Sequence, residues 1–175
     1  MSRCTTTSAS SRRRWSRRCP DDRGVTRLAA APVPYPGAVL TIDKAIYDAI
    51  VEHARADHPD EACGVVAGPA GSDLPQRFVP MANAARSPTF YEFDSADLLK
   101  LYREMDDRDE EPVVVYHSHT ATEAFPSRTD ISYASEPNAH YVLVSTRDAD
   151  GLGEFQFRSF RIVDGTVSEE EVVVK

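Results

Sequence analysis

Residues 112–119 read Pro112-Val113-Val114-Val115-Tyr116-His117-Ser118-His119, a short β-branched apolar run that ends in two histidines. Such a run is typical of a buried strand, which here would carry both histidines at its carboxyl end. Because side chains alternate between the two faces of a strand, His117 and His119 should share one face while Ser118 points to the other. Two imidazoles on one face can bind one metal ion, so the stretch predicts a metal site at the end of a strand.

A third metal ligand is expected from Asp130. Catalytic zinc ions typically have three protein ligands and leave the fourth position to water. Residues 120–126 look like a loop, and Ser127 looks like the start of a helix that would carry Asp130 back toward the histidines. Taken alone, Ser127 favours a helix N-cap and Asp130 an early-turn acid, so only their combination with the histidines indicates a metal site.

A general base for hydrolysis is expected from Glu61, far upstream of the histidines. This glutamate stands at the beginning of a second apolar run, residues 62–68, which predicts another strand. An isolated glutamate is usually a surface carboxylate. Beside a metal site, however, a carboxylate can take a proton from attacking water and pass it to a departing amine.

Together these residues resemble the signature of the JAMM (MPN-plus) zinc metallopeptidases. In that signature an early glutamate is followed by His-x-His, seven residues, serine, two residues and aspartate, and this chain matches every position. The resemblance implies that His117, His119 and Asp130 bind zinc. It implies that Glu61 is the general base and that Ser127 donates a hydrogen bond to the oxyanion of the tetrahedral intermediate. It also implies a deaminase-like α/β fold, a mixed β-sheet with helices on both faces.

The resemblance extends beyond the signature, over roughly residues 39–175. Residues 58–64, 80–84, 87–90 and 116–124 resemble the actinobacterial branch of the family, the CysO-cysteine peptidases. One departure is Thr120, because many eukaryotic ubiquitin-cleaving members have proline directly after the second histidine. This departure disfavours a ubiquitin-type substrate.

The resemblance implies hydrolysis of the amide between the C-terminal glycine of a ubiquitin-like sulfur-carrier protein and cysteine. Free cysteine would be released, as the last step of a cysteine biosynthesis route. Processing or isopeptide cleavage of another ubiquitin-like carrier is an alternative, and a non-catalytic MPN scaffold is another. The complete signature disfavours the scaffold, while the identity of the carrier and the oligomeric state stay open.

Other families with a His-x-His pair fit the sequence less well. A metallo-β-lactamase pattern requires aspartate and histidine where this chain has Ala121 and Thr122. An amidohydrolase barrel typically needs about 250 residues, more than this chain has. A cupin motif accommodates Glu123, but it requires a second motif, and His140 is the only histidine downstream.

The remaining pattern predicts a single domain of strands and helices. Strands are expected at 40–42, from 61, near 77–81 and 90–93, at 140–145, through 155–162 and up to 174. Helices are expected at 44–57, from 94–95 to about 107, and from Ser127. In the strand at 155–162 the alternation of apolar and polar residues is interrupted near Arg158-Ser159, which predicts a bulge. Turns are expected at 148–151 and at Asp164-Gly165.

Residues 1–36 differ in composition from the rest of the chain. They hold eight arginines against two acids, so they carry about six positive charges while the chain as a whole stands at -8. We expect a basic disordered tail or a mis-assigned start at 1–36, followed by the metallopeptidase domain at 37–175. The acidity of that domain disfavours nucleic acid as a partner, and no apolar stretch approaches the roughly 20 residues of a membrane span.

Two further side chains are ambiguous in the sequence. Cys63 favours a small buried side chain over a reactive thiol. The three cysteines show no paired spacing, which fits a reducing, cytoplasmic compartment. Asn83 is either close to the predicted site, as the resemblance implies, or a turn-capping residue.

Overall fold

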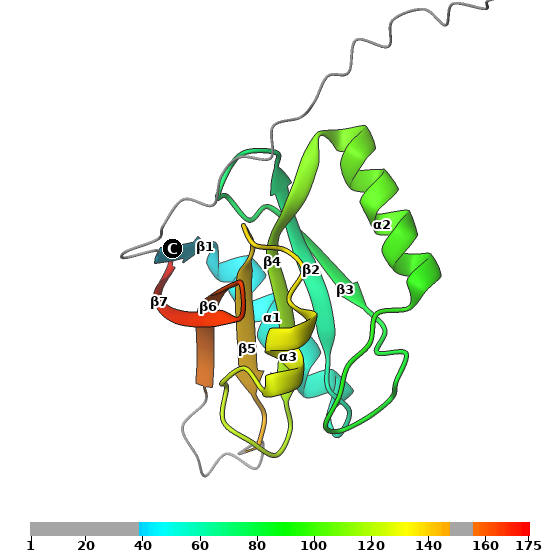
Figure 1. The fold of residues 1–175 in the computed structure, drawn as a ribbon, viewed down its shortest axis with the longest axis vertical. Helices are drawn as coiled ribbons and strands as arrows, with labels where there is room; N and C mark the ends of the chain where they lie inside the picture. Colours follow the sequence, from blue (N-terminus) through cyan, green and yellow to red (C-terminus); the bar gives the residue numbers. More distant parts are fainter. Residues whose placement is uncertain (1–38, 148–155) are drawn as a thin grey trace, which may run out of the picture. The chain divides into compact units, whose positions relative to one another are not determined.

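A mixed β-sheet organises the residues that this computed structural model describes, 39–147 and 156–175 (Figure 1). Its seven strands lie in the order β1-β7-β6-β5-β4-β2-β3. They are β1 (Val39–Ile42), β2 (Cys63–Pro69), β3 (Arg77–Met81), β4 (Glu110–His119), β5 (His140–Ser145), β6 (Gln156–Val163) and β7 (Thr166–Val174). The pairs β1·β7 and β4·β5 are parallel and the other pairs are antiparallel, so the predicted mixed sheet is confirmed.

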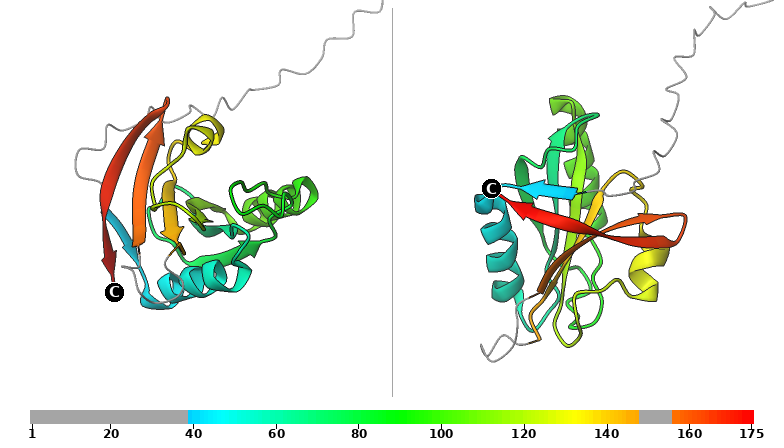
Figure 2. Two further views of the ribbon diagram at one scale, coloured as in Figure 1. Left: turned by 90° about the horizontal axis from the view of Figure 1, so that it is seen from below. Right: turned by 90° about the vertical axis from the view of Figure 1, so that its left-hand side faces the viewer.

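Helices cover both faces of the sheet, as predicted (Figure 2). Helix α1 (Lys44–Asp57) packs on one face through an apolar stripe that includes Ile46 and Ile50. Helices α2 (Ser95–Arg108) and α3 (Arg128–Tyr133) lie on the other face. Within the described ranges, no helix has the length and apolar character needed to cross a membrane.

The alternation of β4 decides which face carries the chemistry. Val114 and Tyr116 join the apolar cluster under α1, whereas Val115 joins the cluster on the α3 side. His117 and His119 follow Val115 at intervals of two residues, so they face the α2 and α3 side. The strand is longer than the predicted run and includes both histidines.

Two predicted features are wrong. Residues 90–93 do not form a strand: they belong to a loop whose only β-pairing among the described residues is an isolated bridge between Asn83 and Phe93. The β5·β6 register is regular through Arg158 and Ser159, and the irregularity lies instead between Val66 and Ala67 of β2. The apparent slip in β6 arises because its buried positions on the α1 side include the polar side chains of Ser159 and Arg161.

Of three other predictions, one turn is confirmed, and the other turn and the N-terminal tail are not tested. The Asp164-Gly165 turn between β6 and β7 is confirmed, with both residues at positive φ (49° and 75°) as a two-residue hairpin of the primed type requires. The predicted turn at 148–151 and the predicted tail at 1–36 lie outside the described residues.

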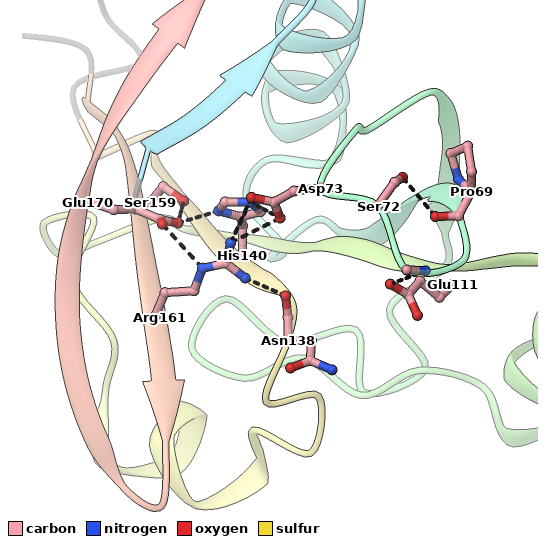
Figure 3. A network of polar contacts seen from close by, with 10 residues as sticks. Pro69, Ser72, Asp73, Glu111, Asn138, His140, Ser159, Arg161 and Glu170 are labelled. Atoms are coloured by element: carbon pink, nitrogen blue, oxygen red, sulfur yellow. Dashed lines mark hydrogen bonds and ion pairs between the residues drawn. The ribbon is translucent and has the colours of Figure 1, made fainter. Parts of the chain in front are cut away.

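A buried polar network joins β5, β6 and β7 to the loop before β3 (Figure 3). Glu170 accepts hydrogen bonds from His140 Nδ1 (2.5 Å), Ser159 Oγ (2.6 Å) and Arg161 Nε (3.2 Å). Arg161 Nη2 also lies 3.0 Å from Asp73 in that loop. Because His140 begins β5, the network lies at the opposite end of that strand from the predicted metal site.

The network yields a stability prediction. Glu170→Gln should destabilise the fold by about 3 kcal/mol, because it leaves the buried charge of Arg161 partly unpaired. Burial acts to raise the pKa of Glu170, but hydrogen bonds from His140 and Ser159 and the charges nearby outweigh it and lower that pKa. A carboxyl group whose pKa is lower in the folded state stabilises the fold at pH values above its pKa in the unfolded chain. The difference in unfolding free energy between the wild type and Glu170→Gln should therefore be largest near neutral pH and shrink as the pH falls below 4.5.

The adjacent Glu169 provides the control for this prediction. Its side chain is 50% exposed and pairs with Arg158 at 2.7 Å, whereas the side chain of Glu170 is 2% exposed. Glu169→Gln should therefore cost less than about 1 kcal/mol. Denaturant unfolding at several pH values measures both variants, and equal losses would contradict the assignment of a buried charge network.

Candidate metal centre

Pairing of β2 with β4 brings Glu61 beside the histidines. Cys63 is the register partner of His117. The ladder continues beyond β2, because Ser118 N donates to Ala62 O (2.9 Å) and Ala62 N donates to Ser118 Oγ (2.8 Å). Extending this register sets Glu61 opposite His119 on the same face of the sheet. Ser118 therefore holds the residue before β2 in place and so positions Glu61, a role that its place in the sequence did not indicate.

Asp130 is positioned by the start of helix α3. Ser127 Oγ accepts from Asp130 N (3.2 Å), and Asp130 Oδ2 accepts from Ser127 N (2.6 Å), so the two residues form a capping box. The prediction of a helix N-cap and an early-turn acid is thus confirmed. The same capping box orients the carboxylate of Asp130 toward the histidines. Asp130 can therefore cap the helix and bind a metal ion at the same time.

Three potential ligand atoms converge at this point. His117 Nε2 lies 3.2 Å from His119 Nε2, Asp130 Oδ1 lies 3.4 Å from His117 Nε2, and Asp130 Oδ2 lies 3.4 Å from His119 Nε2. A tetrahedral zinc ion with bonds of about 2.0–2.1 Å separates its ligand atoms by about 3.3 Å. The donor set and its spacing therefore fit zinc, and this cluster is the group of potential metal ligands found among the described residues.

Hydrogen bonding fixes the ring orientation of His119. Its Nδ1 donates to the backbone oxygen of Glu123 (2.9 Å), with Thr122 Oγ1 at 3.0 Å, so in the neutral imidazole Nε2 carries the lone pair toward the cluster. Burial acts to lower the pKa of His119, but hydrogen bonds to Asp130 and Glu123 outweigh it and raise that pKa. His117 is 2% exposed, and the ring of Tyr91 stacks on it at 4.5 Å. Burial lowers the pKa of His117, which keeps its imidazole neutral.

The two carboxylates have opposite pKa shifts. Burial acts to raise the pKa of Asp130, but hydrogen bonds from His117, His119 and Ser127 outweigh it and hold that pKa well below its usual range. Glu61 is 5% exposed, and burial raises its pKa to about 7, with Asp130 adding to the rise and His119 opposing it. Asp130 thus stays anionic, as a metal ligand must be, while a carboxyl with the pKa of Glu61 can both accept and return a proton near neutral pH.

The structure also places the remaining side chains discussed above. Cys63 is fully buried, as expected, and burial raises the pKa of its thiol to about 12. Asn83 reaches the site and also caps a turn, since its amide donates to Glu61 O and accepts from Ala85 N. Glu123 has an exposed side chain, and His140 lies in the distant network, which is incompatible with a cupin site.

An apolar groove of about 540 Å³ lies between α2 and α3, and its lining includes Asp130 of the cluster. Leu101 and Met105 line it from α2, Tyr133 lines it from α3, and Tyr141 forms part of its floor. Asp130 belongs to the lining and Glu61 does not. The groove therefore approaches the cluster from the Asp130 side.

Known proteins are similar to this chain in sequence and in fold. Residues 43–163 match the family model described as prokaryotic homologs of the JAB domain. The chain is 63% identical over 136 residues to the CysO-cysteine peptidase of Mycobacterium tuberculosis, covering 78% of this chain and 91% of that protein. It is 33% identical over 103 residues to the desampylase of Haloferax volcanii, covering 56% of this chain and 74% of that protein. A solution structure of a protein from Desulfitobacterium hafniense is similar with a TM-score of 0.67 and 29% identity, covering 79% of this chain and 93% of that one.

Proposed function

This chain belongs to the prokaryotic homologs of the JAB domain, and from that premise we propose that it is a zinc-dependent peptidase that releases cysteine from a ubiquitin-like sulfur-carrier protein. The scissile bond joins the C-terminal glycine of the carrier to the amino group of cysteine. The convergence of His117, His119 and Asp130 at 3.2–3.4 Å carries the hydrolytic part of the proposal. The 63% identity to the mycobacterial CysO-cysteine peptidase supports the cysteine part. We place the reaction in the cytoplasm, as part of cysteine biosynthesis.

His117, His119 and Asp130 would hold the zinc ion, which when bound supplies a Lewis acid that polarises the scissile carbonyl and lowers the pKa of water. Glu61 takes the proton from the attacking water and returns it to the nitrogen of the departing amine. The Ser127 hydroxyl uses a lone pair to cap α3, so its O–H is available to donate to the oxyanion.

The groove between α2 and α3 suits the extended tail of the carrier. Its apolar lining can bury the side chains that precede a Gly-Gly terminus. Since Asp130 lines the groove, a tail bound there would bring its last carbonyl to the proposed ligand cluster. The departing amine would then lie beyond the cluster, next to Glu61.

The similarity to the Haloferax desampylase favours a second candidate, the processing or isopeptide cleavage of another ubiquitin-like carrier. The complete set of three ligands and a buried glutamate disfavours a non-catalytic scaffold.

A substrate comparison tests the proposal. We expect cleavage of a carrier–cysteine adduct to be much faster than cleavage of a carrier joined to a lysine side chain, because the site on the Glu61 side is closely covered. Intact mass spectrometry follows both substrates and detects the free Gly-Gly terminus. Preferential cleavage of the lysine-linked carrier, with the cysteine adduct untouched, would replace the first candidate by the second.

A further inference from the structure

The segment from Asn83 to Phe93 folds back on itself beside Glu61. Asn83 and Phe93 form an isolated β-bridge, and Ala84 N donates to Glu92 O (2.8 Å), so the two ends of the segment are held together. The segment lies at the same end of the sheet as the loop after His119 (Figure 1).

The side chain of Asn83 fixes the interior of this segment. Its Nδ2 donates to Glu61 O (2.9 Å) and Phe90 O (3.0 Å), while its Oδ1 accepts from Ala85 N (3.0 Å) and Glu92 N (3.2 Å). An amide side chain has two donor hydrogens, and both are used here. Because Asn83 is only 8% exposed, these bonds have little competition from water, and they join the segment to the backbone of Glu61.

Two further hydrogen bonds fix the middle of the segment to the site. Glu61 N donates to Ser87 O (3.0 Å), and the hydroxyl of Thr120 donates to Pro88 O (2.7 Å). Thr120 directly follows His119. The bond to Pro88 O uses its side-chain hydroxyl, so this contact depends on a hydroxyl at position 120.

We infer that the Asn83–Phe93 segment, fixed by Thr120, is a rigid wall on the leaving-group side of the site that restricts the departing amine to a small molecule. The inference rests on the proposed function, which places the carrier tail in the groove and the departing amine next to Glu61. A general base that returns its proton to the amine must lie next to that amine. Glu61 is 5% exposed, and the wall is hydrogen-bonded to both its backbone oxygen and its backbone nitrogen. A cysteine can leave through such a site, whereas an amine on a second protein requires the wall to move.

The test compares Thr120→Val, which removes the hydroxyl, with Thr120→Ser, which keeps it. Hydrogen exchange of the backbone amides of residues 84–92, without substrate, should be about fivefold faster in Thr120→Val, because one hydrogen bond is lost. It should be nearly unchanged in Thr120→Ser. This measurement does not depend on catalysis.

The kinetic readout is the ratio of kcat/KM for the carrier–cysteine adduct to kcat/KM for a lysine-linked carrier. We expect this ratio to fall about fivefold in Thr120→Val and to stay constant in Thr120→Ser. Equal losses on both substrates would indicate only structural weakening and would overturn the inference, as would unchanged exchange in Thr120→Val. If the wild type cleaves neither substrate, the proposed function fails, and the exchange data alone then decide whether Thr120 fixes the wall.

Discussion

Glu61→Gln should lower the rate of hydrolysis by roughly two to four decades, because a glutamine cannot accept the proton of the attacking water. The fold and the zinc content should stay unchanged, since glutamine has nearly the same shape and the backbone of Glu61 makes the contacts to Asn83 and Ser87. Single-turnover cleavage of a carrier–cysteine adduct measures the chemical step, and elemental analysis measures zinc.

Glu123→Gln is the matched control for this variant. Glu123 also lies near the ligand cluster, but its side chain is 61% exposed and pairs loosely with Arg158 at 3.8 Å. Its replacement should change the rate by less than about threefold, since exposed ion pairs are worth little. Near-normal turnover in Glu61→Gln would remove Glu61 from the mechanism, whatever the zinc content.

Asp130→Ala should lose both zinc and activity. The change removes one of the three proposed ligands. Even partners that only orient a ligand typically contribute about 10- to 100-fold to metal affinity, so the loss of zinc affinity should exceed that range. Zinc content after dialysis against a weak chelator, together with turnover, measures the effect.

Ser127→Ala separates the loss of a ligand from the loss of the helix cap. Both variants break the capping box, which is worth about 1 kcal/mol, but only Asp130→Ala removes a ligand atom. Ser127→Ala should therefore retain zinc while its rate falls by about two to three decades, as expected for a lost oxyanion donor. Stoichiometric zinc and full hydrolysis in Asp130→Ala would show that the ligand assignment is wrong.

Some features of this site could be predicted because their causes are local. The alternation of side chains in a strand is enough to place His117 and His119 on one face, and a serine three residues before an aspartate is enough to predict a capping box. The same local patterns predicted helix α1 and strand β5 with the bounds that the structure has. The signature as a whole predicted that Glu61 and Asp130 would join the histidines, which the structure brings together.

Other features depend on contacts between distant parts of the chain, and the sequence did not reveal them. Residues 90–93 have a strand-like composition, but Asn83 satisfies the backbone of this segment with its side chain, and no neighbouring strand pairs with it beyond one bridge. The predicted bulge in β6 is absent. Arg161 is a residue type normally found at the surface, but here it is buried against Glu170, so the alternation of apolar and polar residues did not show which side chains face inward.

By itself, the sequence determined the mixed sheet with helices on both faces and the set of side chains that converge on one site. Only the tertiary structure decided the register that sets Glu61 opposite His119, the hydroxyl contact that Thr120 makes with Pro88, and the groove whose lining includes Asp130. The physical reason is the range of the interactions involved. Strand alternation and helix capping act within a few residues, whereas register, burial and cavity shape come from packing and hydrogen bonds between segments far apart in the chain.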